Sequence, residues 1–126
     1  MTVWFDVKHL VASVKPKNFK KMKTSEVFKT VRERGREARV LGVYNPNRLP
    51  KIGLPEGITI DLKMFAQHIK GLPKDQCLVL GRTGYGADFV LGYARHFSRI
   101  HVAILRIADN TYQVLDCSLA GTSIVP

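Results

Sequence analysis

Apolar side chains recur with helical spacing in the first third of the chain. Over residues 7–14 they fall at i, i+3, i+4 and i+7, which predicts a short helix capped by Asp6; an alternative is a strand beginning at residues 4–5. A second helix is predicted to be capped by Thr24 or Ser25 and to run to Glu37 or Arg39, although Gly35 is typical of an earlier C-terminus.

Two more helices are predicted further along the chain. Asp61 is placed to cap a helix over residues 62–70, which carries a single apolar stripe and is stopped by Gly71 and Pro73. Residues 88–97 also have the pattern of an amphipathic helix. The chain is therefore expected to hold three to four helices.

Short apolar or alternating runs predict four strands, over residues 40–44, 77–80, 100–107 and 111–118. The last two form a hairpin centred on Asp109-Asn110. Residues 45–57 are rich in proline and glycine and predict a rigid loop, the place where we expect a partner to bind.

These elements predict one α+β domain over residues 1–126, a length at which a chain can bury its own core. A basic helical portion, residues 1–39, packs on a small, mostly antiparallel sheet formed by residues 40–126 and ending in the C-terminal hairpin. The sequence has no low-complexity tract and no repeat of solenoid length.

The predicted hairpin brings together the candidate catalytic side chains. With a turn at residues 109–110, Ala103 faces Asp116 and His101 faces Ser118, so that the histidine, the carboxylate and the hydroxyl share one face of the sheet. Cys117 then points to the other face, unless a single-residue bulge reverses this.

A histidine oriented by a carboxylate can act as a general base, and catalysis also needs a nucleophile. The candidates are Ser118, Cys77 and Cys117, which would make the chain a thiol or serine hydrolase or an acyltransferase. The alternative, which we favour, is a His101–Asp116 pair that only satisfies polar groups at the sheet end.

Four segments between residues 75 and 126 read DQCLVL, FSRIHVAIL, YQVLDCS and GTSIVP. They resemble the GDLLVF, S-x-x-SHVGI, V-x-E-A and GV-x-x-P segments of the circularly permuted papain-like superfamily, which includes NlpC-type amidases and lecithin-retinol-acyltransferase relatives. The resemblance implies His101 as base and Asp116 as its orienting residue. In those families the nucleophilic cysteine follows the histidine on a later helix, which this sequence lacks, so the resemblance implies a degenerate papain-like scaffold.

The charge is strongly asymmetric. The chain carries 20 Lys+Arg and 10 Asp+Glu, and most of the excess lies in the first fifty residues. Such a surface is suited to a polyanion, either nucleic acid or an acidic protein partner. The alternative is a solvated loop held by Phe19 and Met22. The predicted contact residues are Lys15, Lys17, Lys20, Lys21, Lys23, Lys29, Arg32, Arg34, Arg36 and Arg39.

Other functions have weaker signals. The turn at residues 81–86 has the GxxxxG spacing of a phosphate-binding loop, but Ala87 and Asp88 stand where that loop needs Lys and Ser or Thr. The two cysteines are expected to be buried free thiols, and no cofactor or metal is expected. The sequence shows no signal peptide or membrane-spanning run, so we expect a soluble protein of a reducing intracellular compartment.

The leading hypothesis is therefore a non-catalytic binding or structural protein that contacts nucleic acid or an acidic surface. The hydrolase or acyltransferase is one alternative. A second is a subunit of a homo- or hetero-assembly whose partner completes the fold.

Overall fold

The computed structural model describes residues 3–4, 22–82, 87–92, 97–119 and 121–126, and the structural statements below concern these residues. The strands are β1 (Val3–Trp4), β2 (Arg39–Tyr44), β3 (Lys51–Gly53), β4 (Ile58–Asp61), β5 (Cys77–Arg82), β6 (Phe89–Gly92), β7 (Val102–Ala108), β8 (Thr111–Asp116) and β9 (Ser123–Val125). The α-helices are α1 (Thr24–Glu33) and α2 (Ala66–Lys70), and the 3₁₀ helices are η2 (Pro46–Arg48), η3 (Pro55–Gly57) and η4 (Leu62–Phe65).

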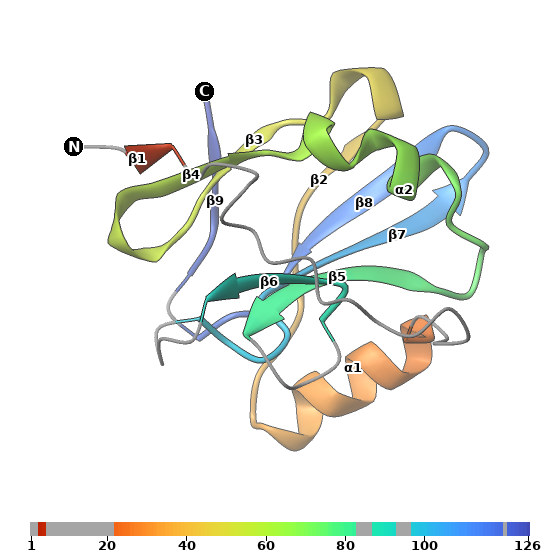
Figure 1. Cartoon of the computed structure of the whole chain (residues 1–126). Coiled ribbons are helices and arrows are strands. Elements are labelled where there is room, and N and C mark those ends of the chain that lie inside the picture. The colour runs from red at the N-terminus through yellow and green to blue at the C-terminus, as the bar shows by residue number, and fades with distance from the viewer. Residues whose placement is uncertain (1–2, 5–21, 83–86, 93–96, 120) are drawn as a thin grey trace.

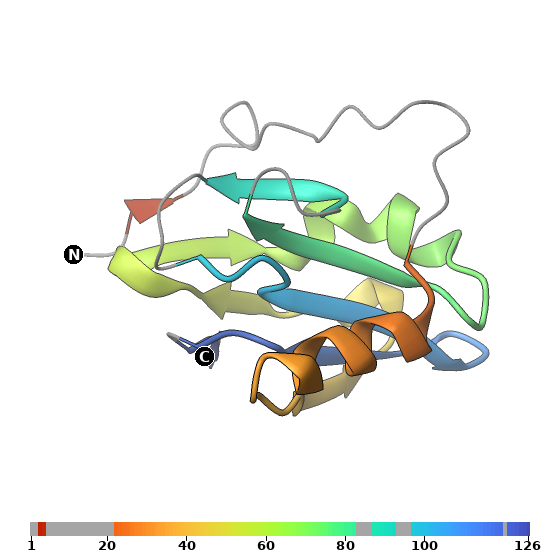
Figure 2. The same cartoon turned by 90° about the horizontal axis from the view of Figure 1, so that it is seen from below.

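The strands form two sheets. The larger has the order β2-β8-β7-β5-β6 and is antiparallel except for the β5–β6 pair. The smaller has the order β1-β4-β3-β9 and is antiparallel except for the β1–β4 pair. Helix α1 covers one face of the five-stranded sheet, and α2 and the four-stranded sheet lie on the other side (Figures 1 and 2).

Alternation along the central strands divides the core in two. Leu78 and Leu80 of β5 and Ile104 of β7 point toward α2 and the four-stranded sheet, where they join the larger apolar cluster. The intervening residues of β5, Cys77 and Val79, point toward α1 and join the second cluster. Both faces of these strands are buried, which explains why their sequence reads as a continuous apolar run.

Helix α1 ends through a regular C-terminal motif. It buries Val27 and Val31 against the sheet and terminates at Gly35, whose φ is +69°. Arg36 N donates to Val31 O at 3.1 Å and Gly35 N donates to Arg32 O at 2.9 Å, the bond pattern of a Schellman motif. The early termination that Gly35 indicated is thus confirmed.

The predicted fold class, one small sheet packed by three to four helices, is wrong. The described residues contain two α-helices and two sheets. Residues 89–92 of the expected helix form β6, because a short apolar run fits a buried strand as well as a helix. The expected loop at 45–57 contains β3, and the helix expected at 62–70 begins as η4. The helix expected at 7–14 lies outside the described residues.

Candidate functional site

The hairpin of β7 and β8 is present, but its register differs from the prediction by one residue. Val102 lies opposite Asp116 and Ala103 opposite Leu115, because a bulge between Arg106 and Ala108 shifts the pairing next to the turn. The predicted Ala103–Asp116 and His101–Ser118 pairs are therefore wrong. Beyond the end of the ladder, Cys117 N donates to His101 O at 2.9 Å.

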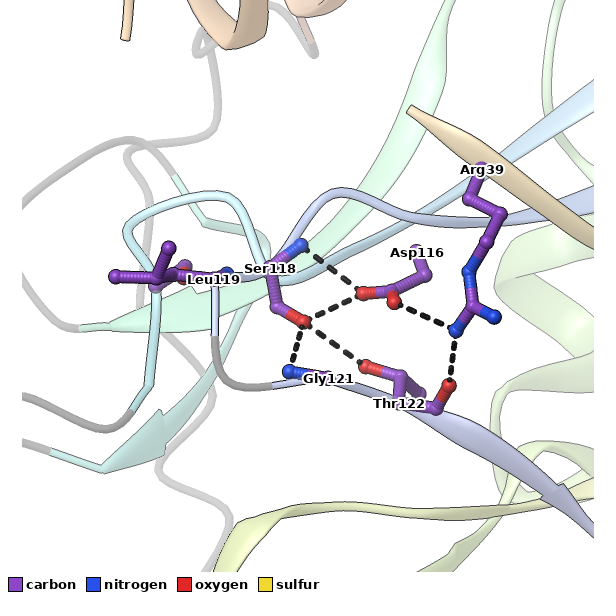
Figure 3. A network of polar contacts seen from close by, with 7 residues as sticks. Arg39, Asp116, Ser118, Leu119, Gly121 and Thr122 are labelled. Carbon is purple, nitrogen blue, oxygen red and sulfur yellow. Dashed lines mark hydrogen bonds and ion pairs between the residues drawn. The ribbon is translucent and has the colours of Figure 1, made fainter. Parts of the chain in front are cut away.

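Asp116 is the centre of a polar cluster at the end of β8 (Figure 3). Its Oδ1 accepts hydrogen bonds from Ser118 N at 3.0 Å and from Ser118 Oγ at 2.5 Å, and its Oδ2 accepts from Arg39 Nη2 at 3.1 Å. Arg39 Nη2 also donates to Thr122 O at 3.0 Å, and Gly121 N donates to Ser118 Oγ at 2.9 Å. The cluster thereby ties β2 and β8 to the segment that leads into β9.

These contacts keep the Asp116 carboxyl ionised. Burial is the largest influence and raises its pKa, but hydrogen bonds from Ser118, Arg39 and Thr122 together outweigh it and hold the pKa below the ordinary value of 3.8. Only 7% of the Asp116 side chain is exposed, against 66% for Arg39, so the carboxylate is buried and its guanidinium partner faces solvent. The buried carboxylate of β8 is thus bonded to the exposed guanidinium of β2.

His101 occupies a separate environment and is fully buried. Its Nδ1 accepts a hydrogen bond from Ser98 N at 3.0 Å, which places the proton of the neutral ring on Nε2. The ring also contacts Phe97 edge-on, with 5.8 Å between the ring centroids. The structure thus gives the imidazole of His101 and the carboxylate of Asp116 different neighbours.

Ser98 and Arg36 were not singled out by sequence for a structural role. Ser98 Oγ accepts hydrogen bonds from Arg36 Nη1 at 3.1 Å and from Leu119 N at 3.0 Å. These bonds join the segment after α1, the segment before His101 and the segment after β8. No local pattern indicates them, because the three segments are far apart in the sequence.

The two cysteines are free and buried, as predicted. Cys77 Sγ contacts Thr24 Oγ1 at 3.6 Å, and burial raises its pKa. Burial, with smaller contributions from Asp116 and Cys77, raises the pKa of Cys117 to about 12. Because the thiolate is the nucleophile, a thiol with such a pKa is poorly reactive at neutral pH.

The residues predicted to contact a polyanion fall into three groups. Lys15, Lys17, Lys20 and Lys21 lie outside the described residues. Lys23, Lys29, Arg32, Arg34 and Arg39 are exposed, and Arg36 is half-buried. The two bases of α1, Lys29 and Arg32, are matched in number by Glu26 and Glu33, and Lys29 Nζ lies 3.9 Å from Glu33 Oε1. In the sequence, the excess of Lys and Arg around α1 therefore precedes Thr24 and follows Glu33.

An open pocket of about 390 Å³ lies next to the Asp116 cluster. Arg39 and Thr122 belong to both, and Gly53, Leu54 and Pro55 also line the pocket. Arg39 is the charged residue of its lining, which also includes Gly121 and Ser123.

Comparisons with protein-family models, curated proteins and solved structures found no match. The papain-like resemblance therefore stays a prediction. Among the described residues no group of His, Cys, Asp and Glu is arranged to hold a metal ion. In the same part of the chain no helix is long and apolar enough to cross a membrane.

Proposed function

We propose that this protein is a non-catalytic binding protein that contacts a polyanion, with nucleic acid as the favoured partner. The observation that carries the proposal is the positive charge of the first fifty residues, together with the exposure of five of the six predicted contact bases that are described. Exposed Lys and Arg neutralise phosphates and release bound counterions, and this term dominates non-specific nucleic-acid affinity.

The distribution of charge around α1 indicates where the contact lies. Glu26 and Glu33 balance Lys29 and Arg32 on the helix, so the midpoint of the helix is a poor phosphate site. Lys23 precedes the helix, and Arg34 and Arg36 follow it. We therefore place the contact at the flanks of α1 rather than along its length.

The environments of the candidate catalytic groups support the non-catalytic part of the proposal. The carboxylate of Asp116 bonds Ser118 and Arg39, and the Nδ1 atom of His101 accepts a bond from Ser98. The Cys117 thiol is buried with a pKa of about 12. Asp116 and His101 thus bond to other groups of the fold, and the Cys117 thiol is poorly ionised at neutral pH.

A salt titration tests the proposal. Binding of the protein to labelled single-stranded DNA, duplex DNA and RNA is measured by fluorescence anisotropy between about 20 and 300 mM salt. We expect measurable affinity at low salt and a log–log slope that falls by about 2 to 3 units in a variant with the flanking bases Lys21, Lys23 and Arg34 changed to Gln, since each phosphate contact contributes roughly 0.9 to the slope on duplex DNA.

The matched control changes Arg48, Lys63 and Lys70 to Gln, three exposed bases remote from α1 in the sequence. This variant loses the same charge and should keep its slope to within about one unit. Equal loss in both variants would point to diffuse attraction and contradict the proposed surface. Absence of binding at low salt, or binding indifferent to salt, would remove the polyanion claim, and labelling by an active-site electrophile that is lost on His101→Ala would favour the enzyme.

A further inference from the structure

We infer that β2 is an interface strand through which two copies of this chain pair antiparallel. β2 lies at the edge of the five-stranded sheet, with β8 as its neighbour. It is six residues long, whereas the other edge strands have four residues (β6), three (β9) and two (β1). An edge strand of this length presents backbone donors and acceptors on which another strand can form a ladder.

The side chains of β2 also favour pairing at this edge. Val40 and Val43 are 52% and 49% exposed, an unusual environment for two valines on one short strand. Natural edge strands are commonly protected by lysine, proline or inward-pointing charges. The four central residues of β2, Val40 to Val43, contain none of these.

Because of a bulge, the side chains of β2 point to the two faces of the sheet in the same order whether the strand is read from its first or its last residue. Val40 lies opposite Leu115 and Val43 opposite Gln113, so both valines lie on the face of the sheet that α1 covers. Without the register shift between Val40 and Gly42, two positions three apart would lie on opposite faces. The shift therefore brings both exposed valines to the same face.

The first and last residues of β2 also lie on one face of the sheet. Arg39 lies opposite Asp116 and Tyr44 opposite Tyr112, so both ends face the larger apolar cluster. An antiparallel pair of two β2 strands centred between Leu41 and Gly42 places Val40 of each copy opposite Val43 of the other, and Arg39 opposite Tyr44. Opposed residues share a face in that register, and β-branched pairs stabilise antiparallel ladders.

The charge on β2 is also compatible with pairing to β2 of a second copy. The charged residue of β2 is Arg39, at its first position. In the antiparallel pair the two Arg39 Cα atoms are separated by about 17 Å along the strands, at roughly 3.3 Å per residue. That distance exceeds the Debye length of about 8 Å at physiological ionic strength, so these like charges are largely screened. The same register joins the two five-stranded sheets into one continuous sheet.

The first test is the mass of the full chain in solution, measured by sedimentation velocity from low to high micromolar concentration at about 150 mM salt. We expect a concentration-dependent dimer. Val43→Lys places a charge at the centre of the ladder and should shift the chain to monomer at every concentration. Ile107→Lys, at a site 48% exposed on β7 and away from the edge, should leave the dimer unchanged.

The second test reports the register. In the paired strands, residue 40 of one copy faces residue 43 of the other, whereas residues 40 and 40 are about 10 Å apart along the strands. A mixture of Val40→Cys and Val43→Cys chains should therefore form a mixed disulfide under mild oxidation, and either variant alone should not. Circular dichroism spectra matching that of the unmodified chain show that each variant is folded.

A chain that stays monomeric throughout the concentration range overturns the inference. So does a dimer that Val43→Lys leaves intact, or one that Ile107→Lys disrupts equally. Cross-linking of each cysteine variant with itself as efficiently as with the other would contradict the antiparallel register.

Discussion

Asp116 is a residue whose importance comes from what it holds together. Through Arg39 it is bonded to β2, and through Ser118 to the segment that leads into β9. Removing one partner of a buried charged hydrogen bond leaves the other unsatisfied, which costs more than the bond itself contributes. The carboxylate is therefore expected to matter for stability, whatever the protein binds.

Asp116→Asn should lower the free energy of unfolding by about 1.5–3 kcal/mol at pH 7, because hydrogen bonds to a charged group are replaced by weaker ones to an amide. The folded-state pKa of Asp116 is lowered, so its stabilising contribution is complete above the unfolded-state pKa of about 3.8 and is lost as the pH falls through the folded-state pKa. The difference between the wild type and the variant should thus narrow below about pH 3.8.

Urea unfolding followed by circular dichroism between pH 6 and pH 2.5 measures this difference. Asp75→Asn is the matched control, since Asp75 is exposed and its change should alter stability by no more than about 0.5 kcal/mol. A gap between Asp116→Asn and the wild type that stays constant with pH would mean that the amide substitution acts by disturbing packing rather than by removing charge.

Helices α1 and α2 end in different ways, and this allows a prediction about each helix end. Gly35 at the end of α1 has a φ of +69° with open space around its Cβ position, whereas Gly71 at the end of α2 has a φ of −84°. Gly35→Ala should therefore destabilise the protein by about 1–2 kcal/mol through backbone strain alone. Gly71→Ala should be neutral or stabilising by up to about 1 kcal/mol, because it restricts the unfolded chain.

Thermal and urea unfolding of the two variants, side by side, measures this contrast. Equal effects of the two substitutions would mean that the left-handed conformation of Gly35 is not required to end α1. In that case the Arg36–Val31 and Gly35–Arg32 bonds would have to survive with alanine at position 35.

The elements that sequence could predict are those with a local cause. The apolar face of α1, the runs of β2 and β5 and the turn of the hairpin at Asp109-Asn110 are all visible in short windows of sequence, and all are present. The bulge near Ile107 has no such signal. It changes the register by one residue and so determines which side chains lie opposite one another in the candidate site.

At the scale of the whole molecule, the part that could not be predicted is the second sheet. Its strands β3 and β9 are three residues long, and Ile52 of β3 pairs with Ile124 of β9, far away in the sequence. Three-residue strands carry too few positions to show an alternation, so their pairing is decided by the long-range packing of residues such as Ile52 and Ile60 in the larger apolar cluster. The Asp116 cluster was hidden for the same reason, because Arg39 and Thr122 are brought together only by the complete fold.

The net charge of +10 leads to a last prediction that depends on no single contact. Like charges on one compact chain repel each other, and salt screens that repulsion. The melting temperature should therefore rise by about 2–5 °C between 20 and 300 mM sodium chloride, corresponding to roughly 1 kcal/mol for a domain of this size. The variant with Arg48, Lys63 and Lys70 changed to Gln should melt higher at low salt and respond less to added salt. Differential scanning calorimetry measures how the melting temperature of the wild type and of the variant changes with salt concentration. A melting temperature that falls with salt would instead mean that favourable ion pairs, such as Arg39–Asp116, outweigh the repulsion among the twenty Lys and Arg side chains.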